Sequence, residues 1–115
     1  MASGTRPRKP AFQWGYLNVT RDIDRIIEQV ESRLPNVLVR KHTVRHPGVD
    51  DDGIWWFSLP NIEKDIQIES SNGTCPFIVE HDDMNSSAEA EVANTVDEAV
   101  EKIAAYLTTL VDRTG

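Results

Sequence analysis

The sequence predicts an α+β fold, a two-layer sandwich in the order helix, four-stranded antiparallel meander, helix. Apolar residues recur at helical spacing near both ends of the chain, and β-branched or alternating segments lie between them. Short connections join those segments, which favours antiparallel neighbours. Each helix has a single apolar stripe, so both are expected to cover one face of the sheet. The 115 residues fit one domain, expected over residues 12–115 after a disordered basic tail at residues 1–11.

The two helices are marked by apolar periodicity and by residues typical of helix ends. The first is expected over residues 20–34, with Thr20 as the N-cap and Pro35 ending it. The second opens at Thr95, which begins a T-x-x-E capping box completed by Glu98. Its apolar stripe continues to Val111.

Four segments between the helices read as strands: residues 36–45, 54–59, 62–69 and 75–81. Asn72-Gly73 predicts a type I′ hairpin between the third and fourth segments. Pro76 places the fourth strand at an edge of the sheet or starts it just after the proline. Residues 82–94, acidic and rich in small side chains, are expected to form a loop.

Neighbouring residues on a strand point to opposite faces, so the two adjacent tryptophans must separate. Trp55 and Phe57 take one side, and Ile54 and Trp56 take the other. One side can pack on the helices, whereas the other needs different cover. Residues 12–17, which are rich in aromatic side chains, can supply that cover; otherwise the face is a binding surface, since tryptophan is favoured at the centre of interfaces. The sequence leaves both alternatives open.

Charge is unevenly distributed along the chain. The net charge is -7, which disfavours general nucleic-acid binding because phosphates are held by positive charge. Residues 1–45 hold nine basic and four acidic residues, whereas residues 46–115 hold three and fifteen. Either the two halves neutralise each other in the fold, or the acidic half attracts a basic partner. We expect no membrane span, because no apolar run approaches ~20 residues, and a cytoplasmic location, because no apolar segment follows Met1.

No group of residues assembles a recognisable catalytic or metal site. Asp50-Asp51-Asp52-Gly53 lacks the alternate ligands and distal glutamate of a calcium loop. Cys75, the sole cysteine, lies beside Pro76 among apolar residues and is expected to pack rather than react. We therefore predict no enzyme activity, no cofactor and no metal. The alternative is a small metal- or ligand-binding enzyme that uses the three histidines, His42, His46 and His81.

The leading hypothesis is a non-catalytic protein-binding module, such as a small acidic inhibitor, immunity-type protein or chaperone, that docks a basic protein partner. Between Glu80 and Glu101 the sequence has eight acidic residues and no basic one, which favours attraction of a basic surface. A further alternative is a structural homodimer that pairs through the open face or the edge of the fourth strand. The residues expected to contact the partner are Trp56, Glu80, Asp82, Asp83, Glu89 and Glu91.

Overall fold

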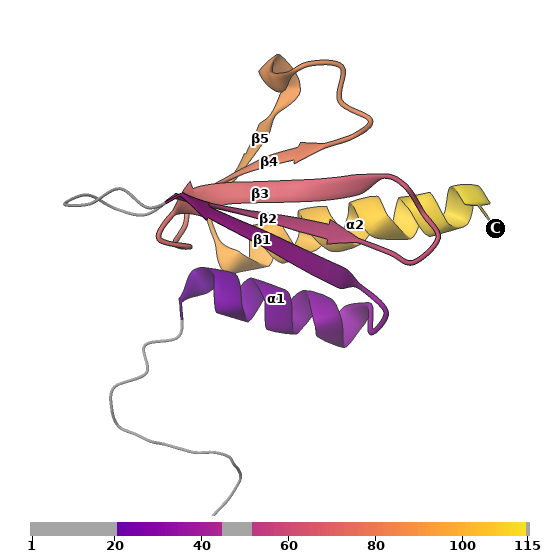
Figure 1. Cartoon of the computed structure of the whole chain (residues 1–115), viewed down its shortest axis with the longest axis horizontal. Helices are drawn as coiled ribbons and strands as arrows, with labels where there is room; N and C mark the ends of the chain where they lie inside the picture. The colour runs from indigo at the N-terminus through magenta and orange to yellow at the C-terminus, as the bar shows by residue number, and fades with distance from the viewer. Residues whose placement is uncertain (1–20, 45–51, 115) are drawn as a thin grey trace, which may run out of the picture.

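A computed structural model describes residues 21–44 and 52–114 as an α+β fold with a five-stranded antiparallel sheet. Each strand pairs with the next one in the chain, so the strands lie in the order β1-β2-β3-β4-β5 (Figure 1). The elements are α1 (Asp22–Arg33), β1 (Leu38–Val44), β2 (Asp52–Ser58), β3 (Asp65–Ser71), β4 (Phe77–His81), the short 3-10 helix η1 (Ser87–Glu89), β5 (Glu91–Ala93) and α2 (Val96–Thr114).

The fold class and the meander are confirmed, but the predicted number of strands is wrong. Residues 82–94 are not entirely loop, because Glu91–Ala93 pairs with β4 as a fifth strand. Three residues are too few to show an alternating pattern, so only the pairing with β4 reveals the strand. As a result β4 is an inner strand, and of the two alternatives for Pro76 the structure selects a strand that starts just after it, at Phe77.

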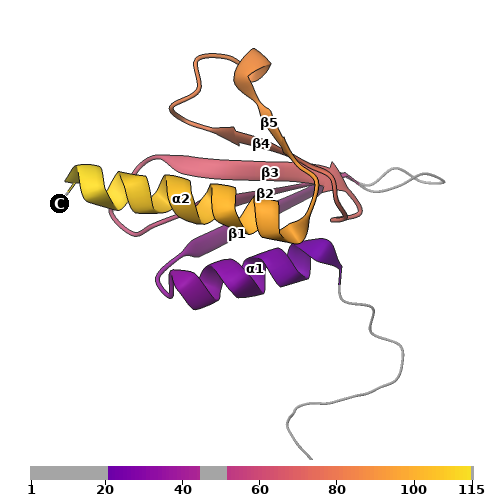
Figure 2. The same ribbon diagram turned by 180° about the vertical axis from the view of Figure 1, so that it is seen from behind.

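Both helices pack on one face of the sheet and share a single core with it. Figure 2 shows α2 lying across the strands with α1 beside it. From the strands the core takes Trp55, Phe57, Ile66 and Ile68, as the alternation predicts. These side chains meet the apolar stripes of the helices, whose largest fully buried members are Ile23, Ile26, Val30, Val100, Ile103 and Leu107.

The helix ends follow the predicted signals in one helix and depart from them in the other. In α2, the Thr95 Oγ1 accepts a 3.1 Å bond from the Glu98 backbone N–H, as a T-x-x-E cap requires. In α1 the N-cap is Arg21, not Thr20. Asp24 completes that turn by accepting the Arg21 backbone N–H at 3.1 Å, because a carboxylate three residues into a helix can satisfy an N–H group left free at its start.

The predicted hairpin between β3 and β4 is present. Asn72 and Gly73 both have positive φ, 55° and 70°, as a type I′ turn requires. The Gly73 carbonyl accepts the Ile23 backbone N–H at 2.9 Å, which ties this turn to the start of α1. Residues 1–11 and 12–17, for which we predicted a tail and a cover for the sheet, lie outside the described residues.

Candidate functional site

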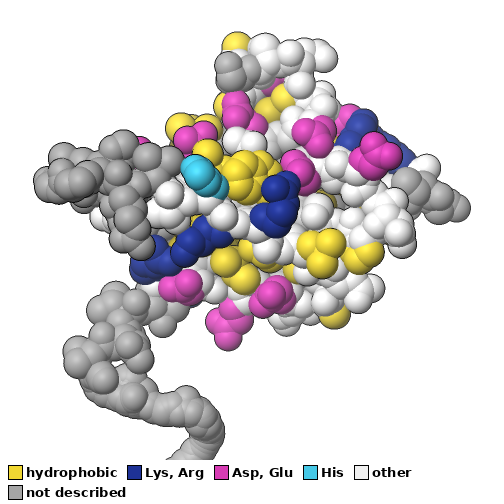
Figure 3. Space-filling view, viewed as in Figure 1, with side chains coloured by type: hydrophobic (Ala, Val, Ile, Leu, Met, Phe, Trp, Pro, Cys, Tyr) yellow, Lys and Arg dark blue, Asp and Glu magenta, His cyan; other side chains and the backbone are white. Residues whose placement is uncertain are grey.

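The sheet face opposite the helices, here called the open face, carries an apolar centre edged by charge. Strand register places fourteen described side chains on this face: Leu38, Arg40, His42, Asp52, Ile54, Trp56, Ser58, Asp65, Gln67, Glu69, Ser71, Ile78, Glu80 and Val92. Three apolar members, Leu38, Ile78 and Val92, are 46–52% exposed. Figure 3 shows apolar side chains gathered on this face with acidic groups around them. Among the described residues nothing packs over this apolar surface as the helices do on the other side.

Trp56 is at the centre of the open face and is held by polar neighbours. Its indole Nε1–H donates to Gln67 Oε1 at 3.1 Å, and the Gln67 amide donates in turn to Glu80 Oε1 at 3.2 Å. The Arg40 guanidinium carbon lies 5.0 Å from the Trp56 ring centroid, within the range of a cation–π contact. The chain from Glu80 to Arg40 therefore crosses four strands and fixes the orientation of a half-buried tryptophan.

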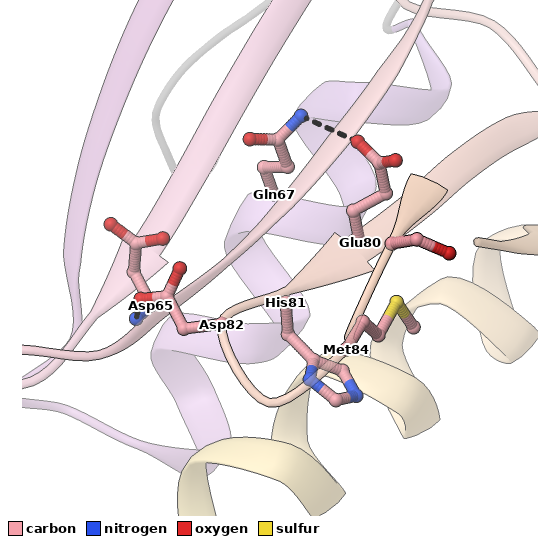
Figure 4. A pocket seen from close by; sticks show the side chains of 7 residues that line it. Asp65, Gln67, Glu80, His81, Asp82 and Met84 are labelled. Carbon is pink, nitrogen blue, oxygen red and sulfur yellow. Dashed lines mark hydrogen bonds between the residues drawn. The ribbon is translucent and has the colours of Figure 1, made fainter. Parts of the chain in front are cut away.

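A hollow of about 270 Å³ opens beside this network. Figure 4 shows the side chains that line it: Gln67 and Glu80 share a hydrogen bond, while Asp65 and Asp82 lie together. Asp82 Oδ2 accepts the Asp65 backbone N–H at 2.9 Å, so the first turn after β4 brings a second carboxylate to the open face. His81, at the end of β4, and Met84 and Ser86, from the segment after it, complete the lining. The hollow is thus bounded mainly by acidic and amide oxygens.

The electrostatics of the hollow favour an added positive charge. Partial burial, followed by the nearby charge of Asp82, raises the pKa of Asp65 above its ordinary value. Arg40 acts in the opposite direction, through a 3.4 Å contact from Nη2 to the Asp65 carboxylate, but does not outweigh them. Among the described residues, Arg40 is the cation placed against Asp65.

The predicted partner-binding acids are divided between different surfaces. Glu80 and Asp82 line the hollow, and Gln67 links Glu80 to Trp56. Asp83 instead receives the Tyr106 hydroxyl at 3.0 Å and pairs with Lys64 at 2.6 Å and Arg113 at 2.9 Å. These contacts hold the pKa of Asp83 well below its usual range. Asp83 therefore links the segment after β4 to α2.

The remaining acids of the run also have local partners. Glu91 pairs with Lys102 of α2 at 2.6 Å, and Glu89 accepts the Asn85 backbone N–H at 3.2 Å. Glu101 pairs with Arg33 of α1 at 2.6 Å, so one basic residue of the first half of the chain neutralises an acid of the second. Arg40 and Asp65 form a similar pair. Among residues 21–44 and 52–114, charges thus cancel locally at the helices, while the open face has more carboxylates than basic groups.

Two of the three histidines of the alternative hypothesis, His42 and His81, are described, and they do not lie together. His42 lies on the open face of β1, whereas His81 belongs to the opposite side, where its ring stacks on Tyr106 with centroids 4.1 Å apart. His46 lies outside the described residues. Across residues 21–44 and 52–114, no three His, Cys, Asp or Glu side chains are grouped as metal ligands.

Cys75 is partly buried against the core, and its backbone N–H donates to Asp22 Oδ2 at 2.8 Å. Burial and the neighbouring Asp22 charge raise the pKa of the Cys75 thiol to about 11. A nucleophilic cysteine needs the opposite shift, because the thiolate is the reactive form. The environment of Cys75 is therefore that of a packing residue.

Sequence reasoning found Trp56, Glu80 and Asp82 but missed Arg40, Asp65 and Gln67. Only the register between strands brings these three residues beside the tryptophan. Comparison with protein-family models, with curated proteins and with solved structures found no match. Within the described part of the chain, no helix has both the length and the apolar character needed to cross a membrane.

Proposed function

We propose that the protein is a non-catalytic protein-binding module that docks a basic partner protein on its open face. The observation that carries the proposal is the half-buried, hydrogen-bonded Trp56 at the centre of that face, next to a hollow lined by carboxylates. This mode of action is the one expected of a small acidic inhibitor, immunity-type protein or chaperone.

The apolar side chains and the acids have different tasks in this proposal. Leu38, Ile78 and Val92 offer apolar area that is still in contact with water, and its burial favours association. Trp56 is already fixed by Gln67, so little side-chain freedom is lost when a partner covers it. The carboxylates at the hollow attract a basic surface and speed encounter.

Docking on the face is better supported than pairing along a sheet edge. One described edge strand, β5, has only three residues. The other, β1, carries the consecutive Arg40, Lys41 and His42. Short edge strands and charged side chains both oppose strand addition. The edge of the fourth strand, one of the two surfaces considered for a homodimer, is already paired with β5.

A random-peptide display library, selected on the full-length chain, tests the proposal with no need to identify the partner first. We expect enriched peptides to combine Lys or Arg with an aromatic or aliphatic residue and to bind more weakly as salt increases. Trp56→Ala should weaken their binding by about 30-fold or more, as loss of a central tryptophan typically does. Val111→Ala is the matched control, because Val111 is 45% exposed on α2, and it should leave binding unchanged.

Three results would refute the proposal. The selection could yield no binding peptide. Enriched peptides could bind the Trp56→Ala variant as tightly as the parent chain. Sedimentation of the parent chain could show a dimer that Trp56→Ala dissociates, in which case the occupant of the face is a second copy and the structural-homodimer alternative is correct.

A further inference from the structure

The chain already places one guanidinium group on its own open face. Arg40, from β1, lies over the Trp56 ring at 5.0 Å and reaches the Asp65 carboxylate at 3.4 Å. An aromatic face next to a carboxylate is a suitable environment for a planar guanidinium, which stacks on the ring and bonds to oxygen at the same time. The arrangement therefore shows which chemical group this part of the face accepts.

Arg40 occupies this position loosely. Its side chain is 65% exposed, whereas the Asp65 side chain is 23% exposed. A single 3.4 Å contact is longer than the 2.7–2.9 Å typical of a charge-assisted bond and is not the two-point pairing that arginine can make. Burial and Asp82 keep the pKa of Asp65 raised even with Arg40 present. The hollow formed by Asp65, Gln67, Glu80 and Asp82 remains open next to it.

We propose, on the basis of the proposed function, that Arg40 is an internal competitor and that an arginine of the partner protein takes its place between Trp56 and the hollow. The partner's guanidinium pairs with Asp65 and the neighbouring carboxylates of the hollow, and Arg40 moves into solvent. Arginine is favoured over lysine because a compact ammonium group cannot stack on the ring and pair with two oxygens in one plane. Arg40 thus lowers the affinity of the open face for the partner. Only those molecules in which Arg40 has left the Trp56 ring are competent to bind.

The sign of this effect distinguishes a competitor from an ordinary contact residue. If Arg40 touched the partner, removing its charge would weaken binding. If it competes with the partner, the same change strengthens binding. A cation–π contact and an exposed ion pair together favour Arg40 over the Trp56 ring, relative to Arg40 in solvent, by about three- to tenfold. Removing Arg40 should therefore improve the affinity for the partner's arginine by about the same factor.

N-acetyl-arginine amide is the probe, titrated into the ¹⁵N-labelled full-length chain while the Trp56 indole N–H is followed by NMR. The indole signal is assigned by its loss in Trp56→Ala. We expect Arg40→Gln to bind the probe about three- to tenfold more tightly than the parent chain. Lys41→Gln is the matched control: it removes the same charge from the next residue, which belongs to the helix side of β1, and should change affinity less than twofold. Asp65→Asn should weaken binding in either background.

Neutral and ammonium analogues test the chemical class. N-acetyl-citrulline amide, which has the shape of arginine without its charge, should not shift the indole signal, and N-acetyl-lysine amide should bind more weakly than the arginine probe. Equal affinity for lysine would overturn the assignment to arginine. Unchanged or weaker arginine binding by Arg40→Gln would overturn the competitor role. Either failure leaves the peptide selection and its dependence on Trp56 intact, so the two proposals fail separately.

Discussion

Trp55 and Trp56 are adjacent in β2 but should differ sharply in what they contribute to stability. Trp55 is 2% exposed and packs edge-on against Phe77, with ring centroids 6.3 Å apart. Trp55→Ala therefore leaves a cavity in the core and should lower the free energy of unfolding by about 3–5 kcal/mol. Trp56→Ala removes one hydrogen bond and one exposed cation–π contact from the open face, and should lower it by about 1–2 kcal/mol.

Urea unfolding followed by far-ultraviolet circular dichroism measures both values, because this signal does not depend on tryptophan emission. For a domain of this size each 1 kcal/mol changes Tm by about 4–8 °C. The two variants should therefore differ in Tm by about 12–24 °C when their stabilities differ by about 3 kcal/mol. If Trp55→Ala does not fold, Trp55→Phe and Trp56→Phe give the same comparison with smaller losses.

The result that would refute this reasoning is an equal loss at the two positions. Equal losses would mean that Trp56 is packed as completely as Trp55, so another part of the chain closes over the open face. The basis for docking a partner there would then be gone. A small loss for Trp56→Ala, combined with weaker peptide binding, is the outcome expected of a residue whose main role is recognition.

Two further predictions concern regions away from the open face. Lys64, then Tyr106 and Arg113, lower the pKa of Asp83 in the folded protein. The ionised Asp83 carboxylate therefore stabilises the fold above about pH 4, the ordinary carboxyl range. This stabilisation is lost as the pH falls through the folded-state pKa. Asp83→Asn should therefore lower the urea midpoint at pH 7 and flatten its decline below pH 4; an unchanged decline would contradict this. Gly73→Ala places a Cβ 2.6 Å from Ile23 Cγ2 at a φ of +70°, and should destabilise by about 2 kcal/mol or more through strain and overpacking. Wild-type stability of Gly73→Ala by thermal unfolding would show that the hairpin and α1 are not in close contact.

The long elements of this fold could be predicted because each satisfies a local rule. The isoleucines of β3 alternate, and Ile66 and Ile68 are buried as that pattern requires. The Asn72-Gly73 dipeptide specifies its turn without help from the rest of the chain. β5 could not be predicted in this way. Its three residues form a strand only because β4 offers free backbone groups beside them, and that is a property of the assembled sheet.

The same distinction explains what was predicted of the candidate site. Alternation alone places Trp56 on the face away from the helices. Its neighbours could not be inferred, because Arg40 and Gln67 reach Trp56 only through the register of three strands. In the sequence, the acidic run indicates one negative field. The structure separates Asp83 and Glu91, which pair with cations, from Glu80 and Asp82 at the hollow, since proximity along a chain does not establish a shared surface.

The connectivity of the sheet has a consequence for synthesis of the protein. Every hairpin closes between segments that are neighbours in the chain, so the strands can assemble quickly as they leave the ribosome. The face of the sheet that bears Phe57 and Ile68, however, is covered partly by α2, the last element to be synthesised. A nascent chain that has completed β5 but not α2 therefore exposes this apolar surface to solvent. It is most prone to aggregation during that interval.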